Sequence, residues 1–128
     1  MRAATRFGLI LSLPVSLGAE SCVFRPIAIA ALRKAKRAWQ VACEVSNMEP
    51  VRATLEADLA IAPLLSHSVP DSLEILAATR RLPKLPTFKI NLYQAANAKP
   101  ATRAFADHVR RCIAGNSSAT TLVFGRAR

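Results

Sequence analysis

The stretch FGLILSLPVSLGAESC (residues 7–22) permits two incompatible interpretations, and the choice between them determines the first element of the structure. A short apolar run follows two arginines and ends in small residues, which is the layout of a secretory signal peptide. The same run could instead be a buried strand that turns at Gly18 and leads into a helix near Ser21. The first interpretation exports the protein and removes the segment, whereas the second makes it the first element of the fold.

Composition limits the chain to one modest domain. It has 128 residues, of which 52% are apolar. No apolar run approaches the roughly 18 residues that a membrane-spanning helix needs, so we expect no membrane association. Cys22, Cys43 and Cys112 are odd in number, widely spaced and without a CxxC pair, which argues against a disulfide framework and a zinc site. We therefore expect reduced thiols in a cytoplasmic protein, with no metal and no cofactor.

The net charge of +10 favours polyanionic partners, either nucleic acid or an anionic membrane. The basic residues are scattered, however, and their largest group, RKAKR (residues 33–37), follows an apolar helix, where cations complement the helix dipole. No aromatic RNA-binding motif or zinc-finger spacing accompanies them. A small basic nucleic-acid-binding protein and an exported solute-binding module remain alternatives at this point.

Hydrophobic periodicity predicts alternating strands and helices. Strand, helix, strand, helix, strand at this spacing indicates βαβ crossovers and an α/β fold with a mixed, mainly parallel sheet. That order favours the strand interpretation of the opening stretch. Residues 114–128 show no clear period, and we expect a disordered tail there. We expect strands over residues 9–17, 37–45, 59–65 and 87–94 and within 67–76, and helices over 21–35, from 47 to 58 and over 100–113.

Three stretches, taken in order, carry a family resemblance. They are LPVSLGAESCVFRPIAIAALRKAKRAWQVACEV (residues 13–45), VRATLEADLAIAPLLSHSVPDSLEIL (51–76) and LPKLPTFKINLYQAANAKPATRAFADHVRRCI (82–113). Their ordered series of Leu-Pro strand, Cys-Val-Phe-Arg helix start, Trp strand, Val-Arg-Ala helix and Leu-Pro-x-Leu-Pro connector resembles the effector-sensing domain of LysR-type transcriptional regulators. The resemblance spans residues 9–113.

This resemblance implies a periplasmic-binding-protein-like sensor of two α/β lobes with a small-molecule cleft between them. Residues 12–80 are similar to the second lobe, and residues 86–113 are similar to the strand and helix that return to the first. Residues 1–8 match nothing in the family. The helix-turn-helix domain and the opening half of the first lobe have no counterpart, so we expect a truncated regulator that does not bind DNA directly.

Two predicted helix starts supply the candidate ligand-binding residues: Ser21 and Cys22 at one, and Ser46, Asn47 and Met48 at the other. Helix N-termini present unpaired N–H groups and a positive dipole end, which bind carboxylates. The resemblance places the 46–48 loop in contact with the effector, and we expect a small, anionic metabolite. Ordinary helix capping by Ser21 and by Ser46 is the alternative interpretation.

No pattern supports catalysis, and we expect the chain not to be an enzyme. No serine lies in a G-x-S-x-G context, and His67 and His108 lack an evident ligand partner nearby. The strand and helix over 87–113 carry apolar faces that the family packs against its first lobe, which favours a homo-oligomer here. The resemblance places the dimer contact on the helix that includes Phe24–Leu32.

Overall fold

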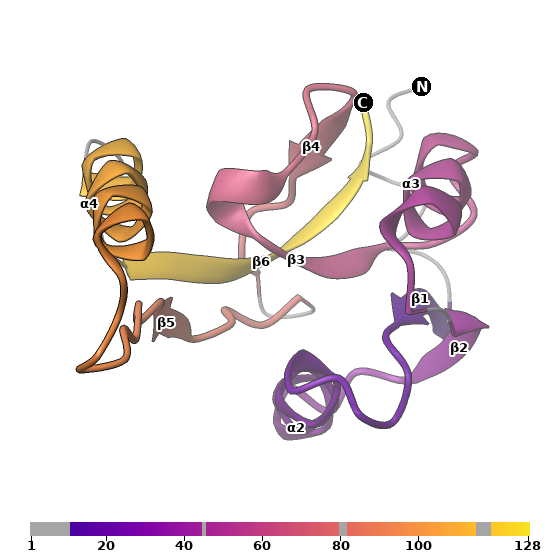
Figure 1. Cartoon of the computed structure of the whole chain (residues 1–128). Helices are drawn as coiled ribbons and strands as arrows, with labels where there is room; N and C mark the ends of the chain where they lie inside the picture. The colour runs from indigo at the N-terminus through magenta and orange to yellow at the C-terminus, as the bar shows by residue number, and fades with distance from the viewer. Residues whose placement is uncertain (1–10, 45, 80–81, 115–118) are drawn as a thin grey trace.

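The computed structural model describes residues 11–44, 46–79, 82–114 and 119–128 (Figure 1). It has a mixed α/β architecture with two small sheets. The elements in chain order are β1 (Leu13–Leu17), α2 (Phe24–Lys34), β2 (Trp39–Glu44), α3 (Met48–Glu56), β3 (Ala62–Leu65), the 3-10 turn η2 (Ser66–Ser68), β4 (Leu73–Ile75), β5 (Thr87–Lys89), α4 (Pro100–Ala114) and β6 (Ala119–Ala127).

The first sheet is the predicted βαβ unit. Strands β1 and β2 pair in parallel, with Leu13 opposite Trp39 and Leu17 opposite Glu44. Helix α2 connects them, so the strand interpretation of the opening stretch is confirmed for the described residues. The turn after β1 requires glycine, because a Cβ on Gly18 would lie 2.6 Å from the Cβ of Cys22.

The second sheet contradicts two predictions. It is antiparallel and is built around β6, which pairs with β3, β4 and β5. The expectation of a mainly parallel sheet is therefore wrong, and so is a disordered tail over 119–127. Leu122 and Phe124 are buried, whereas Thr121 and Val123 are partly exposed, which is the period-2 pattern of a strand with one face in the core. A Cβ on Gly125 would lie 2.8 Å from Leu64, so glycine there permits the close approach of β3.

The two sheets meet at β1. The backbone N–H of Ser16 donates to the Ile61 carbonyl at 2.8 Å, and the Ile61 N–H donates to the Pro14 carbonyl at 3.0 Å. A register shift between Val15 and Ser16 marks the same place on the other edge of β1. Strand β1 is thus held from both sides, and its end is fixed relative to both sheets.

Helices α2 and α3 cover opposite sides of this junction (Figure 1). Ala28 and Leu32 of α2 are completely buried in the larger core with β1 and β6, and Val51 and Leu55 of α3 pack in a smaller core with β3 and β4. Full burial of a leucine or valine side chain contributes about 1.5–3 kcal/mol. The two helices therefore fix the position of the strand ends between them.

The helix boundaries correct one predicted cap and confirm another helix start. Helix α2 begins at Phe24, and its N-cap position is Val23, which makes no side-chain cap bond, so Ser21 is not the cap. A preceding turn takes over, because the Arg25 N–H donates to the Cys22 carbonyl at 3.1 Å. Helix α3 begins after Asn47 as predicted, and the Asn47 side chain accepts from the Glu49 N–H at 3.3 Å. Asn47 thus takes the capping role considered for Ser46.

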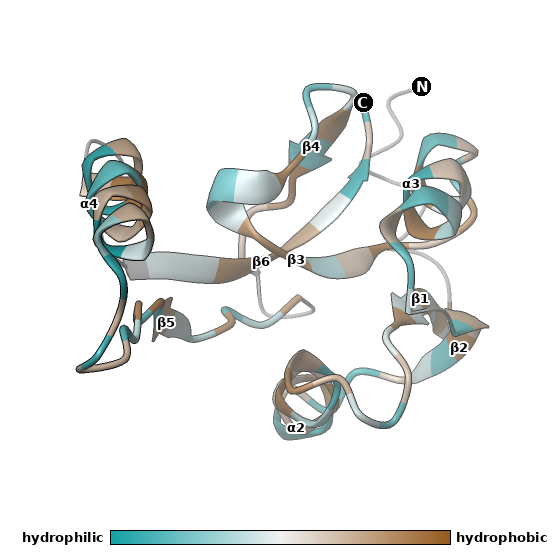
Figure 2. Cartoon of the chain, in the orientation of Figure 1, coloured by the Kyte–Doolittle hydropathy of each residue, from teal (hydrophilic) through white to brown (hydrophobic). Residues whose placement is uncertain are grey.

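Helix α4 forms where predicted but packs little. Ala106 is its buried residue, whereas Phe105 on the predicted apolar face is 68% exposed. The helix lies at the far end of β6, and its alternating brown and teal colouring reflects its amphipathic sequence (Figure 2). The neighbouring strand β5 is also shorter than the predicted 87–94 and ends at Lys89.

Candidate functional site

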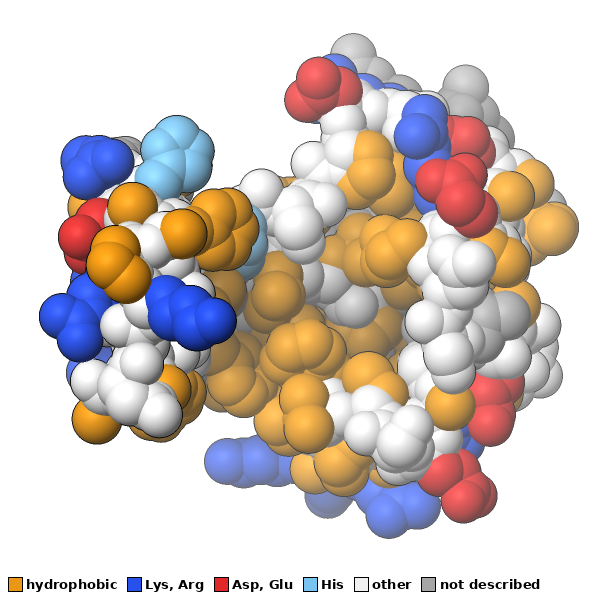
Figure 3. Space-filling model, in the orientation of Figure 1, with side chains coloured by type: hydrophobic (Ala, Val, Ile, Leu, Met, Phe, Trp, Pro, Cys, Tyr) orange, Lys and Arg blue, Asp and Glu red, His pale blue; other side chains and the backbone are white. Residues whose placement is uncertain are grey.

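A pocket of about 380 Å³ opens where the end of β1 meets the N-terminal ends of α2 and α3. This volume lies within the range of small-molecule sites. Hydrophobic side chains gather on the central face of the molecule, over β3 and β6, while the charged side chains lie at its periphery (Figure 3). The pocket is lined by Ser16, Leu17, Gly18, Ala19, Ser21, Cys22, Phe24, Arg25, Ser46, Asn47, Met48, Val51, Ala62, Pro63, Leu64, Leu65 and Ser68.

All five residues predicted from the two helix starts line this one pocket. Ser21 and Cys22 come from the turn before α2, and Ser46, Asn47 and Met48 come from the loop before α3. The parallel pairing of β1 with β2 brings these two segments together, because the carboxyl ends of parallel strands meet at one edge of the sheet. That they bind a ligand remains a prediction.

Arg25 is the one cationic side chain among the described lining residues. Its Nη1 donates to the Gly18 carbonyl at 2.7 Å and lies 2.8 Å from Oε2 of Glu44. The Arg25 side chain is 18% exposed and that of Glu44 is 45% exposed. The guanidinium therefore links the turn after β1 to the last residue of β2.

Ser16 contributes a buried hydroxyl to the pocket. The residue is 1% exposed, and its Oγ has no hydrogen-bond partner among the described residues. An unpaired buried hydroxyl costs about 1–3 kcal/mol unless some partner satisfies it. The atom is thus an unused donor and acceptor in the wall of the pocket.

Sequence reasoning did not select Arg25 or Ser16 as site residues. Arg25 stood in the Cys-Val-Phe-Arg stretch of the resemblance, but its contacts with Gly18 and Glu44 depend on tertiary structure. Ser16 had one available signal, since it is a polar residue in an otherwise apolar strand. Its burial and missing partner become visible only with the fold.

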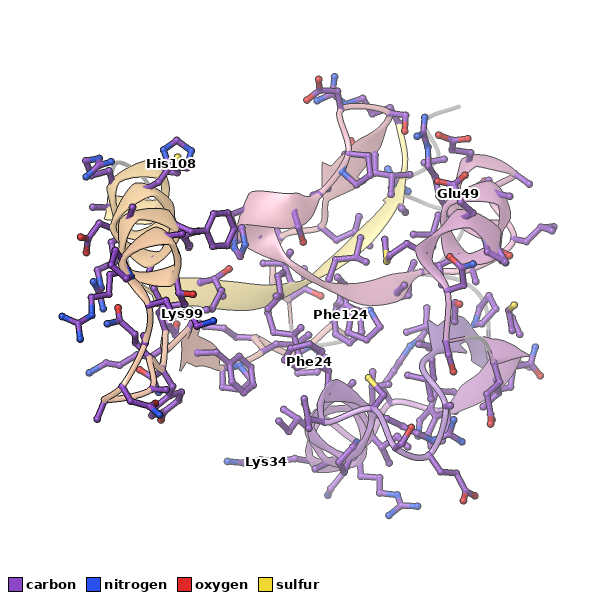
Figure 4. The ribbon with its side chains drawn as sticks, viewed as in Figure 1. Phe24, Lys34, Glu49, Lys99, His108 and Phe124 are labelled. Atoms are coloured by element: carbon purple, nitrogen blue, oxygen red, sulfur yellow. The ribbon has the colours of Figure 1, made fainter. Side chains whose placement is uncertain are left out.

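Figure 4 shows how side chains divide between the interior and the rim: Phe24 and Phe124 lie toward the middle, and Lys34, Glu49, Lys99 and His108 lie outside. Phe24 and Phe88 pack edge to face, with ring centroids 5.3 Å apart, and Phe24 also lines the pocket. The pocket floor is therefore continuous with the larger core. An apolar ligand body would rest on a packed surface.

Neither histidine lines the pocket, although His67 adjoins the lining residue Ser68. His67 Nδ1 is 2.6 Å from Thr120 Oγ1. His108 Nε2 is 3.5 Å from Cys112 Sγ, four residues along α4, so the expectation that His108 lacks a nearby partner is wrong. Among the described residues, no group of three or more His, Cys, Asp or Glu could hold a metal ion. No helix in the described part of the chain is long and apolar enough to cross a membrane.

The sequence is similar to part of a known transcriptional regulator. Over 102 residues, 79% of this chain, the sequence is 31% identical to the HTH-type transcriptional regulator DgdR of Burkholderia cepacia. The match covers 35% of that regulator's length. This chain is thus similar to about a third of a transcriptional regulator. No protein-family model matches the chain, and no solved structure matches it with significance.

Proposed function

We propose that this chain is an effector-sensing module of a LysR-like transcriptional regulator and that the pocket binds a small anionic metabolite. The observation that carries the proposal is the convergence of the 21–22 turn and the 46–48 loop on one pocket together with Arg25. The similarity to a transcriptional regulator and the ordered LysR-like stretches support the regulatory context. The module acts by binding in the cytoplasm, without catalysis and without direct DNA contact.

The chemistry of the lining favours this kind of ligand. The start of α3 offers backbone N–H groups and the positive end of its dipole, and Arg25 adds a guanidinium. Leu17, Phe24 and Leu64 supply apolar contact for the ligand body. Small-molecule sites usually combine a few polar groups with a mostly apolar wall.

A ligand screen with a blocked pocket tests the proposal. Ser46 is an exposed lining residue, so Ser46→Trp fills the pocket mouth without removing a buried group. We expect some carboxylate metabolites to raise the melting temperature of the wild type and to lose that effect in Ser46→Trp. Thr102→Trp, at an exposed position on α4, is the control and keeps the response. A response that Ser46→Trp leaves unchanged contradicts the pocket as the binding site.

We further propose a homodimer through α2, the helix that includes Phe24–Leu32. Phe24, Ile27 and Leu32 pack on the chain's own core, so the surface left for a second copy is formed by the exposed Pro26, Ala30, Arg33 and Lys34. The like charges on the two copies would repel, and salt would strengthen the contact by screening them.

Light scattering after gel filtration tests the dimer. Ala30→Arg adds a further positive charge to the centre of the proposed contact, which already carries Arg33 and Lys34, and should give a monomer. Ala104→Arg makes the same change at an exposed site on α4 and should leave the dimer intact. A wild-type monomer at high protein concentration in both low and high salt would overturn the α2 contact.

A further inference from the structure

We propose that Ser16 and Arg25 form the carboxylate-binding subsite of the pocket, and that Glu44 occupies Arg25 until a ligand displaces it. The inference rests on the proposed function and adds to it the contacting atoms and the competitor. Two independent observations carry it: a buried hydroxyl without a partner, and a guanidinium already held by a carboxylate of the same chain.

The Ser16 hydroxyl is the first half of the subsite. It lies on β1 beside the register shift, at the position where the strand turns its edge toward Ile61. Because the residue is 1% exposed, bulk water satisfies its hydroxyl poorly. A rotation of the Ser16 side chain toward the pocket would let its hydroxyl donate to a ligand carboxylate and so gain the hydrogen bond that it lacks among the described residues.

The Arg25–Glu44 pair is the second half. Both described contacts of the guanidinium are made by Nη1, to the Gly18 carbonyl and to Glu44. Arginine carries five N–H donors, and its planar fork matches a carboxylate. Glu44 is about half exposed and sits at the open end of β2, so it can move into solvent at little cost, whereas Gly18 is fixed in the backbone. A ligand carboxylate therefore competes with Glu44 and leaves the Gly18 contact in place.

The number of donors favours a carboxylate over a phosphate dianion. Among the described lining residues the pocket offers one guanidinium, already partly neutralised, and no lysine. A single negative charge with two oxygens fits one guanidinium and one hydroxyl. The class of ligand is thus a small molecule with one carboxylate on an apolar body.

Displacement of Glu44 by a ligand would also affect residues outside the pocket. Glu44 pairs with Leu17 across the β1–β2 sheet, and Arg25 joins the ends of both strands. When the ligand replaces Glu44, the end of β2 loses its side-chain link to α2 while the turn at Gly18 keeps its own. Ligand binding is thereby coupled to the freedom of the Glu44 side chain at the end of β2.

The test is an NMR titration of the isotope-labelled chain with hexanoate and with its uncharged analogue hexanamide. Amide signals of pocket residues report the binding site. A ligand of this size binds weakly, so the titration extends to about 50 mM. We expect hexanoate to shift the signals of residues 16–25 and hexanamide to bind at least several-fold more weakly.

Three variants separate the contributions. Glu44→Gln removes the competitor and should tighten hexanoate binding about threefold to tenfold, in line with a partly exposed ion pair. Glu49→Gln makes the same charge change on the first turn of α3, outside the lining, and is its control. Arg25→Met should abolish discrimination between hexanoate and hexanamide.

Ser16→Ala gives a signature that a merely structural role would not produce. Removing the unsatisfied hydroxyl should raise the melting temperature of the empty protein and weaken hexanoate binding at the same time. Ser12→Ala, just before β1 and outside the lining, should change neither. Equal hexanoate affinity in the wild type, Ser16→Ala and Glu44→Gln overturns the subsite but leaves the pocket as a ligand site. If neither compound shifts pocket signals at the highest concentration, the subsite fails together with the anionic ligand.

Discussion

Residues 13–65 and residues 82–127 form two regions whose helices are amphipathic in sequence but pack to different extents. In the first region, α2 buries two apolar side chains in a core that includes β1, and α3 buries two in a core that includes β3 and β4. In the second, the 15-residue α4 buries Ala106, and β6 carries the packing. All three helices have a distinct apolar face. They differ in whether that face packs against other residues of the chain.

The amphipathic pattern of a helix therefore shows which side is apolar, but it does not show whether other residues pack against that side. Helix α2 sits in a βαβ crossover, where the short connections on both ends press it onto the sheet. Helix α4 lies between β5 and β6, which pair with each other in an antiparallel way and leave the helix beyond the sheet end. A hairpin can close without its connecting helix, whereas a parallel pair cannot.

The largest expected effect comes from deleting residues 119–128. Strand β6 pairs with three other strands and places Leu122 and Phe124 in the larger core, so its loss should abolish cooperative thermal unfolding. Circular dichroism on heating is the measurement. A shortened chain that melts at the wild-type temperature would restore the view of this segment as a tail and remove the contrast with the first region.

Two substitutions, one in α2 and one in α4, measure directly how much each helix contributes to stability. Leu32→Ala in α2 removes a completely buried side chain and should reduce the free energy of unfolding by about 2–5 kcal/mol. Phe105→Ala in α4 removes a larger side chain that is 68% exposed and should stay within about 0.5 kcal/mol. Urea unfolding of both variants decides the point. Equal losses would mean that the face of α4 is covered in solution, for instance by a second copy.

Sequence reasoning succeeded where local pattern and chain order act together. The alternation around Trp39, the helix start at Asn47 and the helix from Pro100 all follow from nearest neighbours. It failed for β6, because a strand near the end of the chain that pairs with β3, β4 and β5 depends on contacts with distant residues, up to 63 positions away for Ala62 opposite Gly125. Arg126, 7% exposed, and Glu74 form an ion pair in this sheet that no local signal predicts.

The candidate site divides in the same way. Helix starts are visible in sequence, so Ser21, Cys22, Ser46, Asn47 and Met48 could be selected before the fold was known. Arg25 could not be selected in this way, because its contact with Glu44 joins α2 to β2. Ser16 could not be selected either, because its unpaired hydroxyl is recognised only when its burial is known. The missed residues are those whose chemistry arises from packing.

The smallest expected effect concerns two similar ion pairs, one in each region. Arg52 and Glu56 lie 2.8 Å apart on α3, and Asp107 and Arg110 lie 2.6 Å apart on α4. The nearby Ser72 hydroxyl and the Arg52 guanidinium lower the pKa of Glu56 below its usual value of 4.5. A carboxyl whose pKa is lower in the folded state stabilises the fold above its unfolded pKa, and this contribution is lost as the pH falls through the folded pKa.

Glu56→Gln should therefore lower the melting temperature slightly at neutral pH, and the difference from wild type should vanish well below pH 4.5. Asp107→Asn should leave the melting temperature unchanged at both pH values, because its pair lies within a helix that adds little to the packed core. The control is Lys99→Gln, an exposed charge change next to the start of α4. If Asp107→Asn and Glu56→Gln change the melting temperature equally at each pH, α4 unfolds together with the first region. The difference in burial between α2 and α4 then has no effect on the cooperativity of unfolding.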